Sequence, residues 1–147
     1  MSQMNRIKGG LVNQKKSISF TFNGQILTGF EGDTLASALL ANNKKLVGRS
    51  FKYHRPRGIV TAGSEEPNAI MEIGNGAYKE PNTKATITQL YNGLEANSQN
   101  HRGPLGFDLM AITDFLSPLL GAGFYYKTFM WPKAFWEKFY EPAIRNA

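Results

Sequence analysis

The stretch "SISFTFNGQILTGFEGDTLASALLANN", residues 17–43, changes its hydrophobic period partway along and so predicts the fold. Its first six residues alternate strictly, with Ile18, Phe20 and Phe22 on one face, which is typical of a half-buried strand. Asn23-Gly24 follows, the strongest short-range hairpin signal, and "QILTGF" returns as a second strand.

The second half of the stretch, "EGDTLASALLANN", has the features of a helix. Asp33 or Thr34 is expected to cap its N-terminus, and Asn42-Asn43 to close it. A hairpin followed by a helix is the opening of a β-grasp fold. The predicted class is therefore α+β, a β-grasp (ferredoxin-like) domain.

Three further short strands are expected after the helix, in "GIVTAG", "NAIMEIG" and "KATITQL". With them the β-grasp domain covers residues 17–96, preceded by an N-terminal arm, residues 1–16. From residue 97 a polar connector leads into "FDLMAITDFLSPLL", which has apolar residues at helical spacing. Half of the 18 aromatic residues then lie between Phe124 and Tyr140. Residues 97–147 are thus predicted to form a helical, aromatic-rich extension that docks on the β-grasp unit or on another domain.

The net charge of +6 is concentrated in one place. No acidic residue lies between Asp33 and Glu65, an interval that holds six basic residues and so carries the whole excess. The stretch "GRSFKYHRPRG" is expected to be a loop with Pro56 and Gly58 as punctuation. A solvated loop, a nucleic-acid contact, an anionic cofactor and an acidic partner surface all remain open. The candidate cofactor-binding or partner-binding residues are Arg49, Lys52, Tyr53, His54, Arg55 and Arg57.

Other chemistries have little support in the sequence. The absence of cysteine excludes disulfides, cysteine nucleophiles and thiolate-bound iron within this chain. Neither His54 nor His101 has enough neighbouring ligands for zinc, so no metal site and no catalytic residue are predicted. Glu65 and Glu66 are expected to face solvent or to pair with the basic loop. The N-terminus lacks a signal peptide and no apolar window suits a membrane span, so we expect a cytoplasmic protein without membrane contact.

Two longer stretches, "GRSFKYHRPRGIVTAGSEEPNA" and "AGFYYKTFMWPKAFWEKFYEPAIRNA", resemble the N-terminal region of the alpha subunits of heterotetrameric sarcosine oxidases. The resemblance extends from about residue 10 to the end of the chain. It implies a flavoprotein complex, an oxidoreductase acting on CH–NH donors, that serves sarcosine catabolism. That complex demethylates sarcosine oxidatively to glycine, producing hydrogen peroxide together with formaldehyde or methylene-tetrahydrofolate.

The same resemblance implies FAD, FMN, NAD and tetrahydrofolate in the complex and no cofactor in this chain. The implied partners are the remainder of the alpha subunit and the beta, gamma and delta subunits, with no nucleic acid. Because the family continues into a dinucleotide-binding domain that would begin after "IRNA", we expect this chain to be a fragment. No flavin, folate or sarcosine site can be assigned to its residues.

One departure from ferredoxins is informative. A ferredoxin of this fold holds its cluster with thiolates from the loop after the first helix. Here "GRSFKYHRPRG" occupies that region, which suggests that the basic loop replaces a cluster-binding loop. The chain is therefore predicted to be a structural and assembly domain. The alternative is a stand-alone module that binds nucleic acid or anions through residues 49–57.

Overall fold

The computed structural model describes residues 3–7, 9–118 and 135, and its chain forms two compact units, Met1–Thr113 and Asp114–Ala147. The strands are β1 (Asn13–Phe22), β2 (Gln25–Glu31), β3 (Gly48–Arg49), β4 (Pro56–Arg57), β5 (Ile70–Ile73), β6 (Glu80–Lys84) and β7 (Leu94–Ser98). The helices are α1 (Leu35–Ala41), the short 3-10 turns η1 (Gly76–Tyr78) and η2 (Leu109–Ala111), and α2 (Ile112–Phe115).

The hairpin β1–β2 forms where the sequence predicts it. Asn23 and Gly24 have φ values of 48° and 76°, the pair of positive angles that the tightest hairpin turns require. On the inward face of β1, Phe20 and Phe22 are buried, while Thr21 between them is half-buried and Ser19 before them is exposed. Strand β1 begins at Asn13, earlier than the alternating pattern indicates, and its pairing with β2 is irregular between Asn13 and Ser17.

The main sheet is mixed and has the order β2-β1-β7-β5-β6. Strands β1 and β7 pair in parallel at its centre, and every other neighbouring pair is antiparallel. A parallel pair needs a crossover connection, and here the long segment between the first hairpin and β7 supplies it. This arrangement, with few helices, is consistent with the predicted β-grasp and α+β class.

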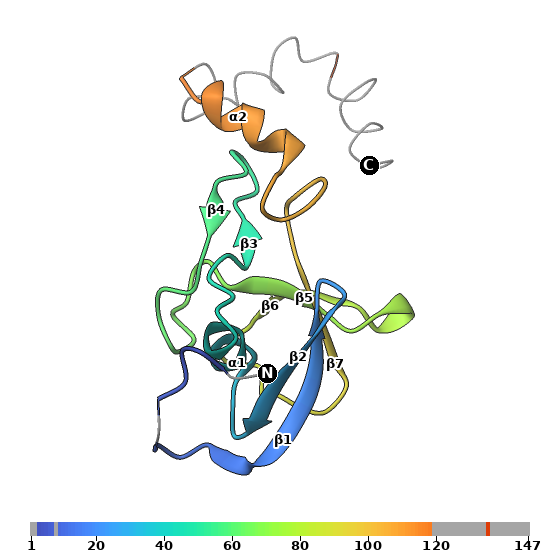
Figure 1. Ribbon diagram of the computed structural model, residues 1–147. Helices are drawn as coiled ribbons and strands as arrows, with labels where there is room; N and C mark the ends of the chain where they lie inside the picture. Colours follow the sequence, from blue (N-terminus) through green and yellow to red (C-terminus); the bar gives the residue numbers. More distant parts are fainter. Residues whose placement is uncertain (1–2, 8, 119–134, 136–147) are drawn as a thin grey trace. The chain divides into compact units, whose positions relative to one another are not determined.

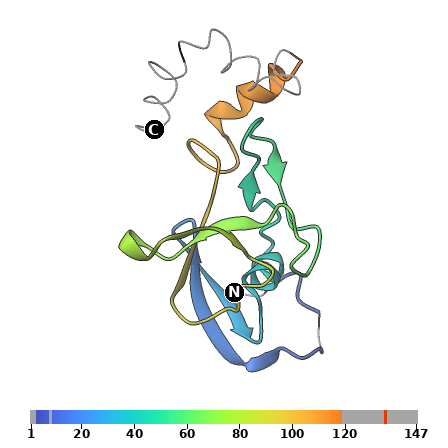
Figure 2. The same ribbon diagram turned by 180° about the vertical axis from the view of Figure 1, so that it is seen from behind.

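Helix α1 lies against one face of the sheet (Figure 1, and from behind in Figure 2). The Thr34 hydroxyl accepts a hydrogen bond from the Ser37 amide and completes a capping box. Leu35 and Leu39 are fully buried and join the core with side chains from the central strands. The core cluster contains Phe20, Phe22, Leu27, Leu35, Ala36, Ala38, Leu39, Val47, Ala69, Met71, Ile73, Ala85, Leu90, Leu94 and Ala96.

Asp33, the other predicted cap, has a different role. Arg6 binds both of its carboxylate oxygens, at 3.1 and 2.6 Å, and the Phe30 amide donates to it at 2.9 Å. The Arg6 guanidinium also lies 4.9 Å from the centre of the Phe30 ring. The carboxylate therefore fastens the N-terminal arm onto the domain.

Two of the predicted later strands are wrong. "GIVTAG" has no regular structure apart from bends, and "KATITQL" contributes only Lys84 to β6 before it continues as turns. The strands in that part of the chain are instead β6 and β7, which hold few of the β-branched or aromatic residues that mark a strand. Pairing with β5 and β1 outweighs their local preference. The strand predicted in "NAIMEIG" is confirmed as β5.

The basic stretch contains a small two-stranded sheet, β3–β4, and is not wholly a loop. The extension predicted from residue 97 overlaps β7 at its start. Its described part holds η2 and α2, and in the second unit the Ser117 amide donates to the Asp114 carbonyl at 3.0 Å. Apart from Phe135, the aromatic run between Phe124 and Tyr140 lies outside the described residues. The domain boundaries at 16/17 and 96/97 stay predictions.

Candidate functional site

Arg49, at the end of β3, uses its guanidinium inside the domain. It donates to the carbonyl oxygens of His54, Leu105 and Gly106 at 2.8, 3.0 and 3.3 Å. Its Nε also lies 3.8 Å from Oδ2 of Asp108, and only 8% of its side chain is exposed. Arg49 therefore holds the β3–β4 hairpin against the segment that follows β7.

His54 reinforces the same connection. Its Nδ1 lies 2.7 Å from Oδ2 of Asp108, whose side chain is fully buried. Asp108 also accepts hydrogen bonds from the amides of Arg102 and Met110. Burial opposes ionisation of Asp108, but these two amides and His54 outweigh it and lower the pKa of the carboxyl. His54 thus makes a structural hydrogen bond, as a lone histidine usually does. Its partner, Asp108, is distant in the chain, so the residues around His54 in the sequence do not indicate it.

The tip of the hairpin gathers cations on one ring. Lys52 Nζ lies 4.9 Å, and the Arg55 guanidinium carbon 4.8 Å, from the centre of the Tyr53 ring. Contacts of this kind are attractive because the face of an aromatic ring is negative. Lys52, Tyr53 and Arg55 each have a further interaction, so none of them is free. The tip is therefore a cluster of positive side chains around one aromatic ring.

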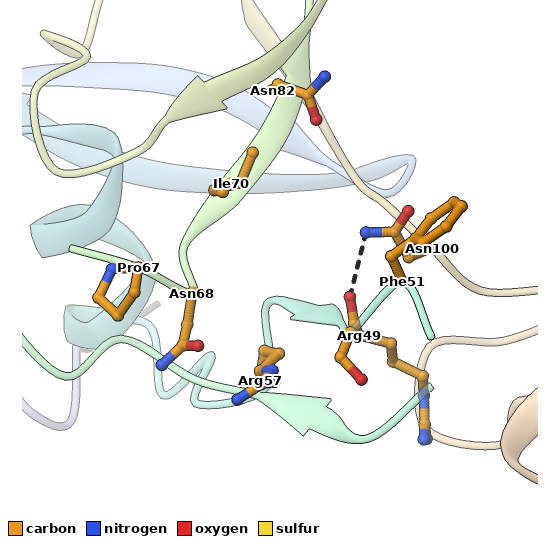
Figure 3. A pocket seen from close by; sticks show the side chains of 9 residues that line it. Arg49, Phe51, Arg57, Pro67, Asn68, Ile70, Asn82 and Asn100 are labelled. Atoms are coloured by element: carbon orange, nitrogen blue, oxygen red, sulfur yellow. Dashed lines mark hydrogen bonds between the residues drawn. The ribbon is translucent and has the colours of Figure 1, made fainter. Parts of the chain in front are cut away.

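Arg57, at the end of β4, faces a pocket of about 320 Å³ (Figure 3). Within the described part of the chain, no hydrogen bond or ion pair engages its half-buried guanidinium. The Asn100 side chain closes one wall by donating to the Arg49 carbonyl at 3.2 Å. The pocket is lined by Arg49, Ser50, Phe51, Arg57, Pro67, Asn68, Ile70, Asn82 and Asn100. Of the six candidate residues, Arg49 and Arg57 line this pocket.

Glu66 lies in the loop between β4 and β5, and the expectation that it faces solvent or pairs with the basic loop is wrong. Its side chain is among the largest that are fully buried. Oε2 accepts hydrogen bonds from the amides of Val60 and Thr61 at 2.9 and 2.6 Å, and from the Thr61 hydroxyl at 3.1 Å. Oε1 accepts from the amides of Asn68 and Ala69 at 2.8 and 3.2 Å. No local signal separates Glu66 from Glu65, which is exposed.

The environment of Glu66 stabilises its charged form. Burial alone would raise the pKa of the carboxyl, but the hydrogen bonds from Thr61, Asn68 and Val60 outweigh burial and lower it to about 2. A buried carboxylate held by several amide donors is fixed in place and has no free lone pair directed at solvent. Glu66 is therefore suited to holding the loop and unsuited to exchanging protons near neutral pH.

Neither the residues around Asp108 nor those around Glu66 form a recognisable catalytic arrangement. In the described ranges, no three side chains of the metal-binding types gather closely enough to hold a metal ion. Within that same part of the chain, no helix is long and apolar enough to cross a bilayer. What the geometry offers is a rigid hairpin, a positive tip and one pocket with an arginine.

The comparisons with known proteins agree on one group of relatives. A family model described as "2Fe-2S iron-sulfur cluster binding domain" matches residues 15–101. A sarcosine oxidase subunit alpha of Rhizobium meliloti (strain 1021) is 62% identical over 147 residues, which is 100% of this chain and 15% of that protein. The subunit of the same name from Corynebacterium sp. (strain U-96) is 39% identical over 100 residues, or 66% of this chain and 10% of the relative.

One solved structure is also similar. The crystal structure of L-proline dehydrogenase from P. horikoshii matches with a TM-score of 0.48 and 28% sequence identity, covering 59% of this chain and 16% of that one. The chain studied here therefore spans only a small part of the length of each relative.

The residues of this chain do not fit the cluster that its family name describes. A cluster of that type is held by cysteine thiolates, and the sequence contains no cysteine. The loop between β4 and β5 instead directs its donors at the Glu66 carboxylate. The chain nevertheless belongs to the 2Fe-2S iron-sulfur cluster binding domain family, and along its whole length it is a relative of the N-terminal region of sarcosine oxidase alpha subunits.

Proposed function

We propose that this chain is a structural and assembly domain of a sarcosine oxidase alpha subunit. The observation that carries the proposal is the 62% identity that extends over the entire chain. The match covers the residues of the hairpin, the pocket and the extension. The chain covers 15% of that relative, and we place the chemistry in the parts of the protein outside it.

We also propose an activity for the whole assembly, which the relatives' name supports. We expect the complex to demethylate sarcosine oxidatively to glycine, with hydrogen peroxide and either formaldehyde or methylene-tetrahydrofolate as products. FAD, FMN, NAD and tetrahydrofolate would be bound by the rest of the alpha subunit and by the beta, gamma and delta subunits. We place the assembly in the cytoplasm.

Electron transfer through this domain has no support in its residues. A ferredoxin passes electrons through its cluster, and the thiolates that would ligate one are absent from the sequence. The buried Glu66 carboxylate, with a pKa of about 2, is a structural charge and carries no electron. The role that the residues support is therefore to form contact surfaces for other parts of the protein.

The surface beside the β3–β4 hairpin has the composition of an interface. Phe51, Phe107 and Leu109 are large apolar side chains with exposed fractions of 76%, 72% and 69%. They belong to the hairpin and to the segment that Arg49 and His54 fasten to it. Exposed apolar side chains bordered by arginines are typical of contact surfaces between proteins. We propose that the remainder of the alpha subunit covers them.

A second candidate function is an anion-binding module, and the specific observation that favours it is the position of Arg57. A half-buried guanidinium at a pocket with three asparagine side chains suits a carboxylate or a phosphate. In the assembly, that anion would be an acidic side chain of a neighbouring domain or a cofactor phosphate. Binding of inorganic phosphate or single-stranded DNA to the chain alone would favour the stand-alone module.

Assembly tests the proposal directly. The alpha subunit would be co-expressed with its partners either intact or without residues 3–118, and the subunit composition and flavin content would be measured by native mass spectrometry and absorbance. We expect the shortened subunit to lose partners or flavin. A shortened subunit that assembles with full flavin content and full sarcosine turnover would refute the assembly role.

A further inference from the structure

The loop between β4 and β5 directs its polar donors at a single point. Four backbone amides, from Val60, Thr61, Asn68 and Ala69, donate to the two oxygens of the Glu66 carboxylate over 2.6–3.2 Å. Convergent backbone amides of this kind form anion-binding concavities, which proteins use for phosphates and for iron–sulfur clusters. The loop thus has the donor pattern of a site for an anionic group, and one of its own side chains occupies it.

The spacing within the loop is informative. Thr61, Glu66 and Ala69 are separated by four and then two residues. Plant-type ferredoxins place their first three cluster cysteines at this spacing, C-x4-C-x2-C, and take the fourth from a later segment. The family model for such domains covers these positions in its match to residues 15–101.

A later segment does reach this loop. The Thr86 hydroxyl donates to the Gly63 carbonyl at 2.7 Å, and Thr86 is only 4% exposed. One residue earlier, the Ala85 amide donates to the Ala69 carbonyl at 2.9 Å. Thr86 therefore contacts this loop from a later segment of the chain, as the residue at a fourth ligand position would.

We infer that residues 60–69 and Thr86 retain the cluster cradle of the family, and that the carboxylate of Glu66 is a built-in anion that replaces the cluster within it. The amides that would face the sulfur atoms of a cluster donate to the carboxylate instead. This assigns the former cluster position to residues 60–69, and not to the basic stretch at 48–58 that the sequence suggested. The basic hairpin is then a separate feature with its own pocket.

Restoring the thiolates tests the inference, whatever the outcome of the assembly experiment above. The full chain would carry Thr61→Cys, Glu66→Cys, Ala69→Cys and Thr86→Cys and would be produced with cluster-assembly machinery. A matched control would carry Val60→Cys, Glu65→Cys, Asn68→Cys and Thr86→Cys, which keeps the spacing of the three loop cysteines, shifts them by one residue and leaves the fourth in place. Iron analysis, visible absorption and electron paramagnetic resonance after reduction would be compared.

We expect about two irons per chain and sulfur-to-iron charge-transfer bands in the first variant, and less than a tenth of that iron in the control. A folded first variant without iron would overturn the inference, and so would equal iron in both variants. In the first case the loop could not hold a cluster, and in the second its register would not matter.

A second variant decides the question should the cysteine variant fail to fold. Glu66→Ala removes the carboxylate and leaves its donors in place. We expect its melting temperature to rise by several degrees in sodium formate relative to sodium chloride at the same ionic strength, with no such difference for the unaltered chain. Identical melting in the two salts would show that the loop has no affinity for an anion and would overturn the inference.

Discussion

His54 Nδ1 lies 2.7 Å from Oδ2 of Asp108, although 54 residues separate them in the chain. His54 has a φ of 52°, a left-handed backbone conformation that is uncommon outside glycine and asparagine. Asp108 also accepts from the amides of Arg102 and Met110, so its carboxylate organises the segment after β7. The pair joins the tip of the basic hairpin to that segment of the chain.

Asp108→Asn is expected to destabilise the chain by about 1.5–3 kcal/mol, the usual worth of a hydrogen bond to a charged group. The amide cannot attract His54 and Arg49 as the carboxylate does. Urea denaturation measures the change. Glu80→Gln, an exposed position in β6, removes the same charge and should change stability by less than about 0.5 kcal/mol. An equally large loss in this control would mean that net charge, and not the His54 contact, is responsible.

Glu66 gives the domain a defined acid sensitivity. Its folded pKa of about 2 lies below the ordinary value of 4.5. Ionisation of a group with a lowered folded pKa contributes stability above the unfolded pKa and is lost as the pH falls through the folded one. We therefore expect Glu66→Gln to be less stable at neutral pH and to lose less stability between pH 4.5 and pH 2 than the unaltered chain.

Thermal unfolding across that pH range measures this effect. Glu80→Gln is the control, because Glu80 is exposed on β6 and its loss removes the same charge. Its stability should follow the pH dependence of the unaltered chain closely. Parallel curves for Glu66→Gln and the unaltered chain would contradict the stabilising role assigned to the buried carboxylate.

The sequence predicts an element of this structure when residues close together in the chain determine it, and misses it when distant residues do. The hairpin at Asn23-Gly24 and the cap at Thr34 are determined within a few residues, and both are confirmed. Strand β6 is determined by its pairing with β5, and its own residues, "EPNTK", are poor strand formers. Local patterning therefore identifies the first half of the sheet and misses part of the second.

The candidate site divides in the same way. The sequence identifies the clustered charges, but not that Arg49 donates to backbone carbonyls more than 50 residues away. Glu65 and Glu66 look alike in sequence, and only the folded loop separates the exposed carboxylate from the buried one. Comparison with the cysteine spacing of plant-type ferredoxins would single out position 66, together with positions 61 and 69, but that spacing says nothing of burial.

Gly29, in β2, lies where the sheet packs closely on its neighbours. A Cβ at this position would lie 2.2 Å from Cδ2 of Leu90, which is 2% exposed. Gly29→Ala should cost about 1–3 kcal/mol through overpacking. Gly106→Ala is the control because a Cβ there meets nothing within 4 Å. Chemical denaturation of both variants checks this, and equal stability would show that Leu90 can move aside.

The exposed apolar side chains beside the hairpin should matter for assembly and not for folding. Phe107→Ser and Leu109→Ser are expected to weaken association with the rest of the alpha subunit by about 1.5–3 kcal/mol each, the worth of burying a large apolar side chain. Ile26→Ser on β2 is the control, since Ile26 is 71% exposed on a different part of the domain. Sedimentation of the separately produced pieces measures the association. Equal losses from all three changes would point to a general loss of solubility.

Arg57 is the cation of the hairpin whose charge the described residues leave uncompensated. If it engages an acidic side chain or a cofactor phosphate, Arg57→Glu should weaken assembly or cofactor retention by about 1–3 kcal/mol, through loss of a charge-assisted hydrogen bond and added repulsion. The melting temperature of the chain should change little, because no internal partner is lost. Lys15→Glu, an exposed position in β1, makes the same change of charge away from the pocket. Titration of the subunits at low and high salt should show a salt-dependent loss for Arg57→Glu and none for Lys15→Glu. Normal assembly and full cofactor content in the Arg57 variant would mean that the guanidinium is solvated and the pocket has no ligand.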